Sequence, residues 1–210
     1  MTTFAPDKGV SLLDNVSTDD QFLKLAAELG SPVSIGPEGY IKSLTVKTEE
    51  EAPANSLSAK YGKGSFPFHT DTAFWPRPAR LVLLRALKGD IQRPTYVISF
   101  DELLTGVPNS LIKNSAWICD TGNRKFYTMM HFDADGRQCL RYDPNCMRGA
   151  NRSAKTLESI LTERCSQLNG CKITWKENRL AIISNWTHLH ARGVGPDGEH
   201  QRILQRIYVN

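Results

Sequence analysis

The chain has 210 residues; 40% of them are hydrophobic, 23% are charged, and the mean hydropathy is −0.37. These values are typical of one globular domain, which we place over residues 1–210, and they argue against fibrous and disordered chains. The net charge of +4 comes from scattered lysines and arginines without a basic run, so nucleic acid is not an expected partner.

Membrane and targeting segments are not expected. No apolar stretch approaches the ~18–20 residues that cross a bilayer. The start of the chain lacks the basic and apolar regions of a signal peptide. The five cysteines form no CxxC pair, which argues against a disulfide framework or a zinc ribbon. The sequence therefore predicts a cytoplasmic protein without a membrane partner, and it leaves the oligomeric state open.

The first half of the chain predicts one helix, one loop and two strands. Residues 18–30 are typical of a helix, with Thr18 or Asp19 as the N-cap, an apolar stripe and a final Gly30. Residues 48–66 are polar and rich in Ser, Glu and Gly, which indicates a loop or lid. Residues 80–87 and 96–100 predict strands, the second followed by a short helix capped at Ser99.

The second half predicts more strands and a longer helix. Residues 125–132 and 139–142 indicate two strands on either side of a turn at 133–136, and residues 172–175 and 180–184 indicate two more. The helix spans 153–169, with one apolar face formed by Leu157, Ile160, Leu161, Cys165 and Leu168.

A last strand, 202–209, alternates between two faces. One face carries Ile203, Gln205, Ile207 and Val209, and the other carries Arg202, Leu204, Arg206 and Tyr208. Many strands, few helices and no βαβ order favour a mainly β sandwich or barrel, with the helices packed outside it.

The sharpest local motif is His69-Thr-Asp71. In an extended segment, residues two apart point to the same side, so this imidazole and carboxylate can bind one metal ion. A second histidine would complete a two-histidine, one-carboxylate triad, the arrangement that leaves positions open on non-haem iron. The C-terminal region offers two candidates, His188 and His190. Strand register alone does not choose between them.

Several motifs in order carry a family resemblance. They are His69-Thr-Asp71 with Ala73-Phe74, the stretch Leu83–Asp90, Asn185-x-x-x-x-His190-x-Arg192, and Arg202-Ile-Leu-Gln-Arg206. Together they resemble the Fe(II)/2-oxoglutarate-dependent dioxygenases of the TauD type, and especially the clavaminate-synthase-like amino-acid hydroxylases. The match covers about residues 56–100 and 179–209. It implies a double-stranded β-helix, or jelly roll, with a few flanking helices.

The resemblance also implies roles for particular residues. His69, Asp71 and His190 would be the iron ligands, since the spacing from Asn185 selects His190 over His188. Arg202 and Thr95 would bind the distal carboxylate of 2-oxoglutarate. Arg206 would bind an acidic group of the primary substrate, for which Ser58 and Trp75 are further candidate contacts.

The implied reaction uses Fe(II), 2-oxoglutarate and O2. It couples oxidative decarboxylation, which gives succinate and CO2, to hydroxylation or a related C–H oxidation of a carboxylate-bearing small molecule, such as an amino acid. Asp71 favours this outcome over halogenation, because halogenating relatives have a small residue there. The alternative is a non-catalytic jelly-roll module that binds a metal or an anion without turnover.

Overall fold

The computed structural model describes residues 9–53, 56–134, 136–195 and 202–210. Residues 1–8, on which the expectation about a signal peptide depends, lie outside this part of the chain, as does Asp135 of the predicted turn. Within the described ranges, no helix is both long and apolar enough to span a bilayer.

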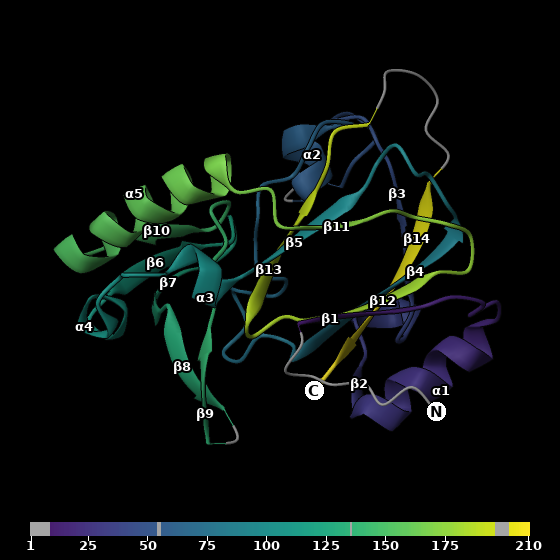
Figure 1. The fold of residues 1–210 in the computed structure, drawn as a ribbon, viewed down its shortest axis with the longest axis horizontal. Coiled ribbons are helices and arrows are strands. Elements are labelled where there is room, and N and C mark those ends of the chain that lie inside the picture. Colours follow the sequence, from purple (N-terminus) through teal and green to yellow (C-terminus); the bar gives the residue numbers. More distant parts are fainter. Residues whose placement is uncertain (1–8, 54–55, 135, 196–201) are drawn as a thin grey trace.

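The order of elements is shown in Figure 1. The helices are α1 (Asp19–Leu29), α2 (Leu57–Tyr61), α3 (Phe100–Leu103), α4 (Asn109–Lys113) and α5 (Arg152–Gln167), with a short 3-10 helix, η2 (Gly36–Glu38). The strands of the first half are β1 (Val10–Leu13), β2 (Pro32–Val33), β3 (Lys42–Thr45), β4 (Leu81–Lys88) and β5 (Thr95–Ser99). Those of the second half are β6 (Ala116–Asp120), β7 (Lys125–Met129), β8 (His131–Ala134), β9 (Arg137–Leu140), β10 (Met147–Gly149), β11 (Cys171–Ile173), β12 (Leu180–Ser184), β13 (His188–Arg192) and β14 (Ile203–Val209).

Two antiparallel sheets face each other and form the jelly roll. The larger sheet has the order β1-β12-β4-β14-β2, with β3 also paired to β14, and the smaller has the order β11-β5-β13. Apolar side chains from both sheets fill the space between them, among them Val82 and Leu204 from the larger sheet and Val97 and Ile173 from the smaller. This space also holds the candidate site.

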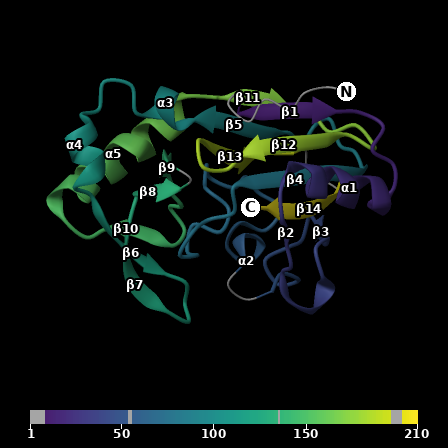
Figure 2. The ribbon, with the colours of Figure 1, turned by 90° about the horizontal axis from the view of Figure 1, so that it is seen from below.

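Each sheet is covered on its outer face by a different layer. α1 packs Phe22 and Ala26 against the outer side chains of β4, β12 and β14. The smaller sheet is covered by a lobe formed from α3, α4, α5 and the sheet β10-β6-β7. Figures 1 and 2 show α1 and α5 at opposite ends of the molecule, with the two sheets between them.

Most of the predicted elements are present. Thr18 caps α1 through a full capping box with Gln21, and α5 begins one residue earlier than predicted, with Asn151 as its N-cap. The prediction of a continuous strand over 125–132 is wrong. The chain breaks at Met130 into β7, which pairs with β6, and β8, which pairs with β9. All five cysteines are free thiols.

Candidate metal centre

His69 and His190 are joined directly through their backbones. The amide of each residue donates to the carbonyl of the other, with N···O distances of 3.0 Å and 3.1 Å, which makes an isolated antiparallel bridge beside β13. The two rings consequently lie side by side in the space between the sheets, with centroids 4.5 Å apart and planes tilted by 48°. Two residues 121 positions apart in the sequence (190 − 69) thus form one half of a site.

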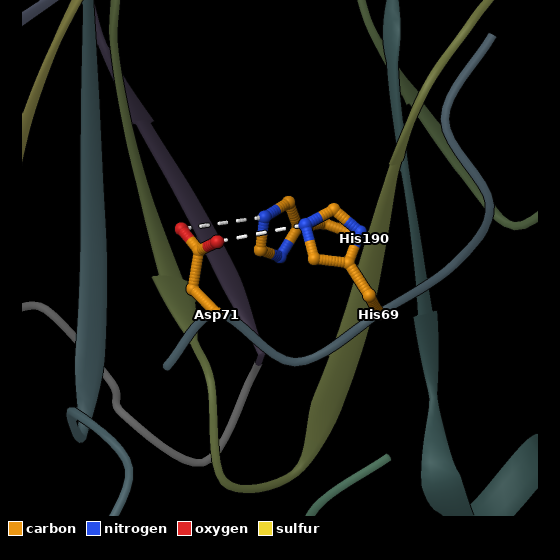
Figure 3. Close-up of side chains that lie close together, drawn as sticks. All are labelled: His69, Asp71 and His190. Atoms are coloured by element: carbon orange, nitrogen blue, oxygen red, sulfur yellow. Dashed lines mark ion pairs between the residues drawn. The ribbon is translucent and has the colours of Figure 1, made fainter. Parts of the chain in front are cut away.

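Asp71 brings a carboxylate to the same point. One oxygen lies 3.5 Å from His69 Nε2 and the other lies 3.7 Å from His190 Nε2 (Figure 3). One ligand atom from each of the three residues falls within 4.8 Å of the others. His69, Asp71 and His190 are all buried, with exposed fractions of 4%, 9% and 7%. The structure therefore brings together the three residues that the sequence predicts as metal ligands.

The protonation of Asp71 and His190 suits a metal ion. Burial alone raises the pKa of Asp71, but the charges of Arg206 and His190 and the hydrogen bond from His69 outweigh it and lower the pKa well below its usual range. Burial and the nearby His69 lower the pKa of His190 to about 3, so this ring is neutral at neutral pH. An ionised carboxylate and a neutral imidazole are the forms that bind metals.

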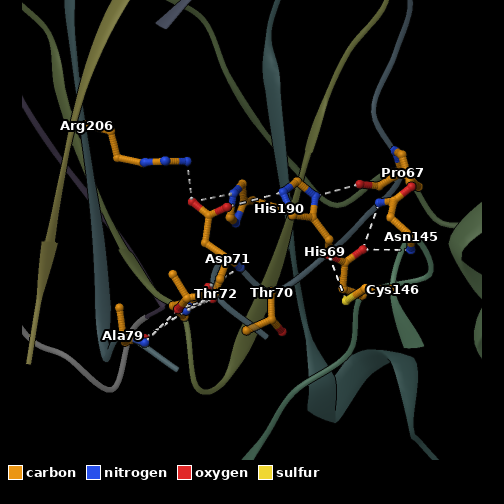
Figure 4. A network of polar contacts seen from close by, with 12 residues as sticks. Pro67, His69, Thr70, Asp71, Thr72, Ala79, Asn145, Cys146, His190 and Arg206 are labelled. Carbon is orange, nitrogen blue, oxygen red and sulfur yellow. Dashed lines mark hydrogen bonds and ion pairs between the residues drawn. The ribbon is translucent and has the colours of Figure 1, made fainter. Parts of the chain in front are cut away.

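The His69 ring is oriented by the backbone. Its Nδ1 lies 2.9 Å from the carbonyl oxygen of Pro67 (Figure 4). Because a carbonyl only accepts, Nδ1 donates, and Nε2 is the ring nitrogen that faces Asp71. Burial lowers the pKa of His69, yet the hydrogen bond to Asp71, the charges of Asp71 and Asp143 and the hydrogen bond to Pro67 raise it more, so a metal ion at Nε2 would replace a proton shared with Asp71. This is the common way in which a metal-binding histidine is held.

Arg206 extends from the inner face of β14 to Asp71. Its Nη1 donates to a carboxylate oxygen at 3.2 Å, and its guanidinium lies over the Tyr208 ring at 4.4 Å. Trp75 packs edge-on against the same Tyr208 ring, with ring centroids 5.8 Å apart. The Arg206 Nε is buried without a hydrogen-bond partner among the described residues. Arg206 and Trp75 therefore adjoin the metal centre through Asp71 and Tyr208.

Arg202 lies in a second group of buried cations. Its Nη1 donates to the Arg93 carbonyl at 2.7 Å, and burial together with the charge of Arg93 lowers its pKa to about 10. The pKa of Arg192 falls to about 9 through burial and the charges of Arg93 and Arg202. Like charges crowded together in a buried place are stabilised by an anion.

This arginine group lies close to the metal centre along β13. Arg192 is two residues beyond His190, roughly 7 Å along a strand, and is paired with Thr95 of β5. The Thr95 hydroxyl accepts from Trp175 Nε1 at 3.0 Å, which leaves its own hydrogen free to donate. The predicted co-substrate residues Thr95 and Arg202 thus meet at one end of the sheet, and their role stays a prediction.

The remaining predicted residues are farther from the three ligands. Ser58 is in α2, the helix within the predicted loop 48–66, and its contact with a substrate stays a prediction. α2 is held at its end by Arg192, which donates to the carbonyls of Gly62 and Gly64. His188 is not one of the three clustered residues; its Nδ1 contacts the Thr187 hydroxyl at 2.8 Å.

Four contributors to the site were given no role by the sequence. Asn185 holds the backbone of Asp71, and Arg93 and Arg192 surround Arg202. Asn185 and Arg192 belong to the motif around His190, so that motif was the available signal. Asp143, whose charge acts on His69, lies in the region 101–178, where no pattern marks it.

Solved structures share this architecture. An asparagine oxygenase, solved with Fe(II), (2S,3S)-3-hydroxyasparagine and succinate, matches with a TM-score of 0.78 over 98% of this chain and 75% of its own length, at 16% identity. The non-haem iron oxygenase OrfP, solved with iron and α-ketoglutaric acid, matches with a TM-score of 0.74 over 96% of this chain and 74% of its own, at 14% identity.

The chain has the fold of the clavaminate-synthase-like iron oxygenases. The PvcB protein from Pseudomonas aeruginosa has it too, with a TM-score of 0.71 over 97% of this chain and 76% of its own, at 14% identity. The expected jelly roll is therefore confirmed. No protein-family model and no curated protein matches the sequence. At such low identity the likeness to these structures establishes the fold alone.

Proposed function

We propose that the protein is an Fe(II)- and 2-oxoglutarate-dependent oxygenase acting on a carboxylate-bearing small molecule, an amino acid or a derivative. The observation that carries this proposal is the meeting of His69, Asp71 and His190 between the two sheets of an oxygenase fold. Two imidazoles and one carboxylate are the donor set of non-haem iron oxygenases, and they leave positions for further ligands.

The donor set fits ferrous iron on chemical grounds. Asp71 is ionised and His190 is neutral; the Pro67 carbonyl holds Nδ1 of His69, so that a metal ion would replace the proton that Nε2 shares with Asp71. When bound, ferrous iron supplies the redox chemistry that couples loss of CO2 from 2-oxoglutarate to oxidation of a C–H bond. The protein supplies the three ligands, the orientation of both organic molecules and a site largely closed to water.

Arg202 and Thr95 would hold the distal carboxylate of 2-oxoglutarate. An arginine offers a planar fork to a carboxylate, and a threonine hydroxyl adds one more donor. Burial and the charge of Arg93 lower the pKa of Arg202, and burial and the charges of Arg93 and Arg202 lower that of Arg192, so a bound carboxylate would relieve the mutual repulsion of the three. This excess of buried positive charge supports an anionic co-substrate at this end of the sheet.

The primary substrate would lie between charges of opposite sign. Arg206 keeps an unpartnered Nε for an acidic group, while Asp143 acts on His69 from the loop that also contains Asn145 and Cys146. An amino acid carries a carboxylate and an ammonium group, which match Arg206 and Asp143. The asparagine oxygenase and OrfP, which share the fold, are described with hydroxyasparagine and hydroxyarginine.

The test is a decarboxylation screen. Purified protein is supplied with Fe(II), O2 and 2-oxoglutarate, and succinate is measured with each of a panel of amino acids and other small carboxylates. We expect at least one compound to raise succinate formation well above the level without substrate, and His69→Ala or Asp71→Ala to abolish it. Failure of the iron-loaded protein to bind 2-oxoglutarate, seen as the absence of its metal-to-ligand absorption band, contradicts the proposal.

A non-catalytic metal- or anion-binding module is the second candidate. The burial of all three candidate ligands is the observation that favours it, because a resident metal needs no open path for a substrate. Under this alternative the protein binds iron and 2-oxoglutarate, yet no compound of the panel changes the rate of succinate formation.

A further inference from the structure

Asn185 makes three hydrogen bonds through a side chain that is completely buried. Its carboxamide oxygen accepts from the Asp71 amide at 3.0 Å, and its nitrogen donates to the carbonyls of Asp71 at 2.9 Å and of Ala79 at 2.8 Å. The amide and the carbonyl of Asp71 are therefore both bound by one side chain. A carboxamide is suited to this task because it carries an acceptor and two donors at one end.

Thr72, directly after Asp71, has a backbone conformation that is rare for its type. Its φ is +57°, in the left-handed region, where a β-branched side chain is crowded. Its hydroxyl donates to the Asp71 carbonyl at 2.6 Å and accepts from the Ala79 amide at 2.9 Å. These two hydrogen bonds stabilise the left-handed backbone conformation of Thr72. Strained residues of this kind cluster at functional sites.

The two side chains together enclose the backbone of Asp71. We name Asn185 and Thr72 the Asp71 clamp; Figure 4 shows Thr72 and Ala79 on one side of Asp71, with His190 and His69 on the other. The chain turns at Thr72 immediately after the carboxylate, so Asp71 lacks the continuous ladder that would hold a strand residue. The clamp replaces that ladder.

We propose that the Asp71 clamp consists of two positioning residues, Asn185 and Thr72, that fix the Asp71 carboxylate opposite the two imidazoles before a metal ion binds. The proposal rests on the proposed function in that it takes Asp71 as a metal ligand. Asn185 also begins the turn that leads into β13 and His190. This segment thus carries one candidate ligand, His190, while its first residue, Asn185, holds the backbone of another, Asp71.

The first test compares Asn185→Ala with Asn151→Ala. Asn151, the N-cap of α5, is the control because its side chain also makes three hydrogen bonds to backbone groups. Its partners are the backbone groups of Ala154, Ala116 and Asn114, which are far from Asp71 in the sequence. Co(II), which has visible d–d bands, is titrated into each metal-free protein. We expect Asn185→Ala to weaken Co(II) binding about 10–100-fold and to alter the band shape, and Asn151→Ala to change neither.

A second pair of variants protects the test against misfolding at position 185. Thr72→Ser keeps the hydroxyl and relieves the crowding of the β-branch, so Co(II) binding should remain within about twofold of the original. Thr72→Val keeps the shape and the crowding but loses both hydrogen bonds, and should weaken Co(II) binding about threefold or more.

The outcomes separate the clamp from the proposed function. If the unaltered protein binds no Co(II) at this site, the metal centre itself fails. If it binds Co(II), and both Asn185→Ala and Thr72→Val bind with unchanged affinity and spectrum while only the unfolding temperature falls, the two residues merely stabilise the fold and the clamp is disproved.

Discussion

The two faces of β14 both carry buried arginine contacts, and they differ in how the charge is balanced. On the outer face, Gln205 accepts from Arg85, a fully buried residue of β4 that also pairs with Asp19 of α1 and lies over the Phe22 ring. On the inner side, the charge of Arg93 acts on Arg202, the residue before β14, and both charges act on Arg192, while Asp90 partly offsets the charge at Arg202. The outer arginine is paired; the inner ones are crowded.

We propose that this difference separates a structural arginine, Arg85, from a ligand-binding one, Arg202. Arg85 docks α1 onto the sheet with partners that the protein itself provides. The inner group carries excess positive charge that lowers the pKa of both Arg192 and Arg202, an arrangement that an anion stabilises. The metal centre lies on the inner side as well, where Arg206 pairs with Asp71.

The largest effect should come from exchanging Arg202, and it should fall on ligand binding. We expect Arg202→Met to weaken 2-oxoglutarate binding about 100-fold or more, since a charge-assisted fork to the carboxylate is lost. The unfolding temperature should move by less than about 3 °C, because the lost bond to the Arg93 carbonyl is offset by relief of crowding. Titration of the iron-loaded protein and thermal unfolding measure the two quantities.

Arg85→Met provides the matched control on the outer face. It should leave 2-oxoglutarate binding unchanged and lower the unfolding temperature by about 5–10 °C, because the Gln205 carboxamide and Asp19 lose their partner. A loss of 2-oxoglutarate binding in Arg85→Met as large as that in Arg202→Met would show that the two faces are not functionally distinct.

A smaller and more selective effect is expected from Arg206→Leu. Arg206, in β14, is four residues beyond Arg202, so the two arginines lie at different depths, and Arg206 is assigned to the primary substrate. The variant should raise the KM of the primary substrate about tenfold or more and that of 2-oxoglutarate less than about threefold. An equal rise in both would remove the division of labour between the two arginines.

The sequence predicted those parts of the molecule whose signals are local. A cap at Thr18 or Asp19 marked the start of α1, the alternation over residues 202–209 marked a last strand, found as β14, and the His69-Thr-Asp71 motif marked two candidate ligands. The third candidate ligand, His190, required the family resemblance, because its neighbour His188 has the same local pattern.

The parts that were missed depend on contacts between distant segments. The chain breaks at Met130 because the residues before it pair with β6 and the residues after it pair with β9. Nothing in the sequence of residues 125–132 indicates these two different partners. The bonds of Asn185 to Asp71 span 114 positions. The left-handed conformation of Thr72 contradicts the preference of its residue type, so no local rule predicts it.

The smallest expected effect concerns a third arginine–aspartate pair, Arg179 and Asp14, whose arginine is less completely buried than Arg85. Arg179 donates to Asp14 through two nitrogens, at 2.7 Å and 3.1 Å, but more than half of the Asp14 side chain is exposed. The hydrogen bond from Arg179 lowers the pKa of Asp14. Asp14→Asn should lower the unfolding temperature by only about 1–2 °C at pH 7, because water and salt screen an exposed pair.

The pH dependence follows from the direction of that shift. A carboxyl whose pKa is lower in the folded state stabilises the fold above about pH 4, and the contribution disappears as the pH falls through the folded-state pKa. The difference between the original protein and Asp14→Asn should therefore shrink below about pH 4 and also shrink in high salt. A difference that grows toward acid pH would contradict the direction of the Asp14 pKa shift. A loss as large as that of Arg85→Met would show that the more complete burial of Arg85 does not decide which of these two pairs matters.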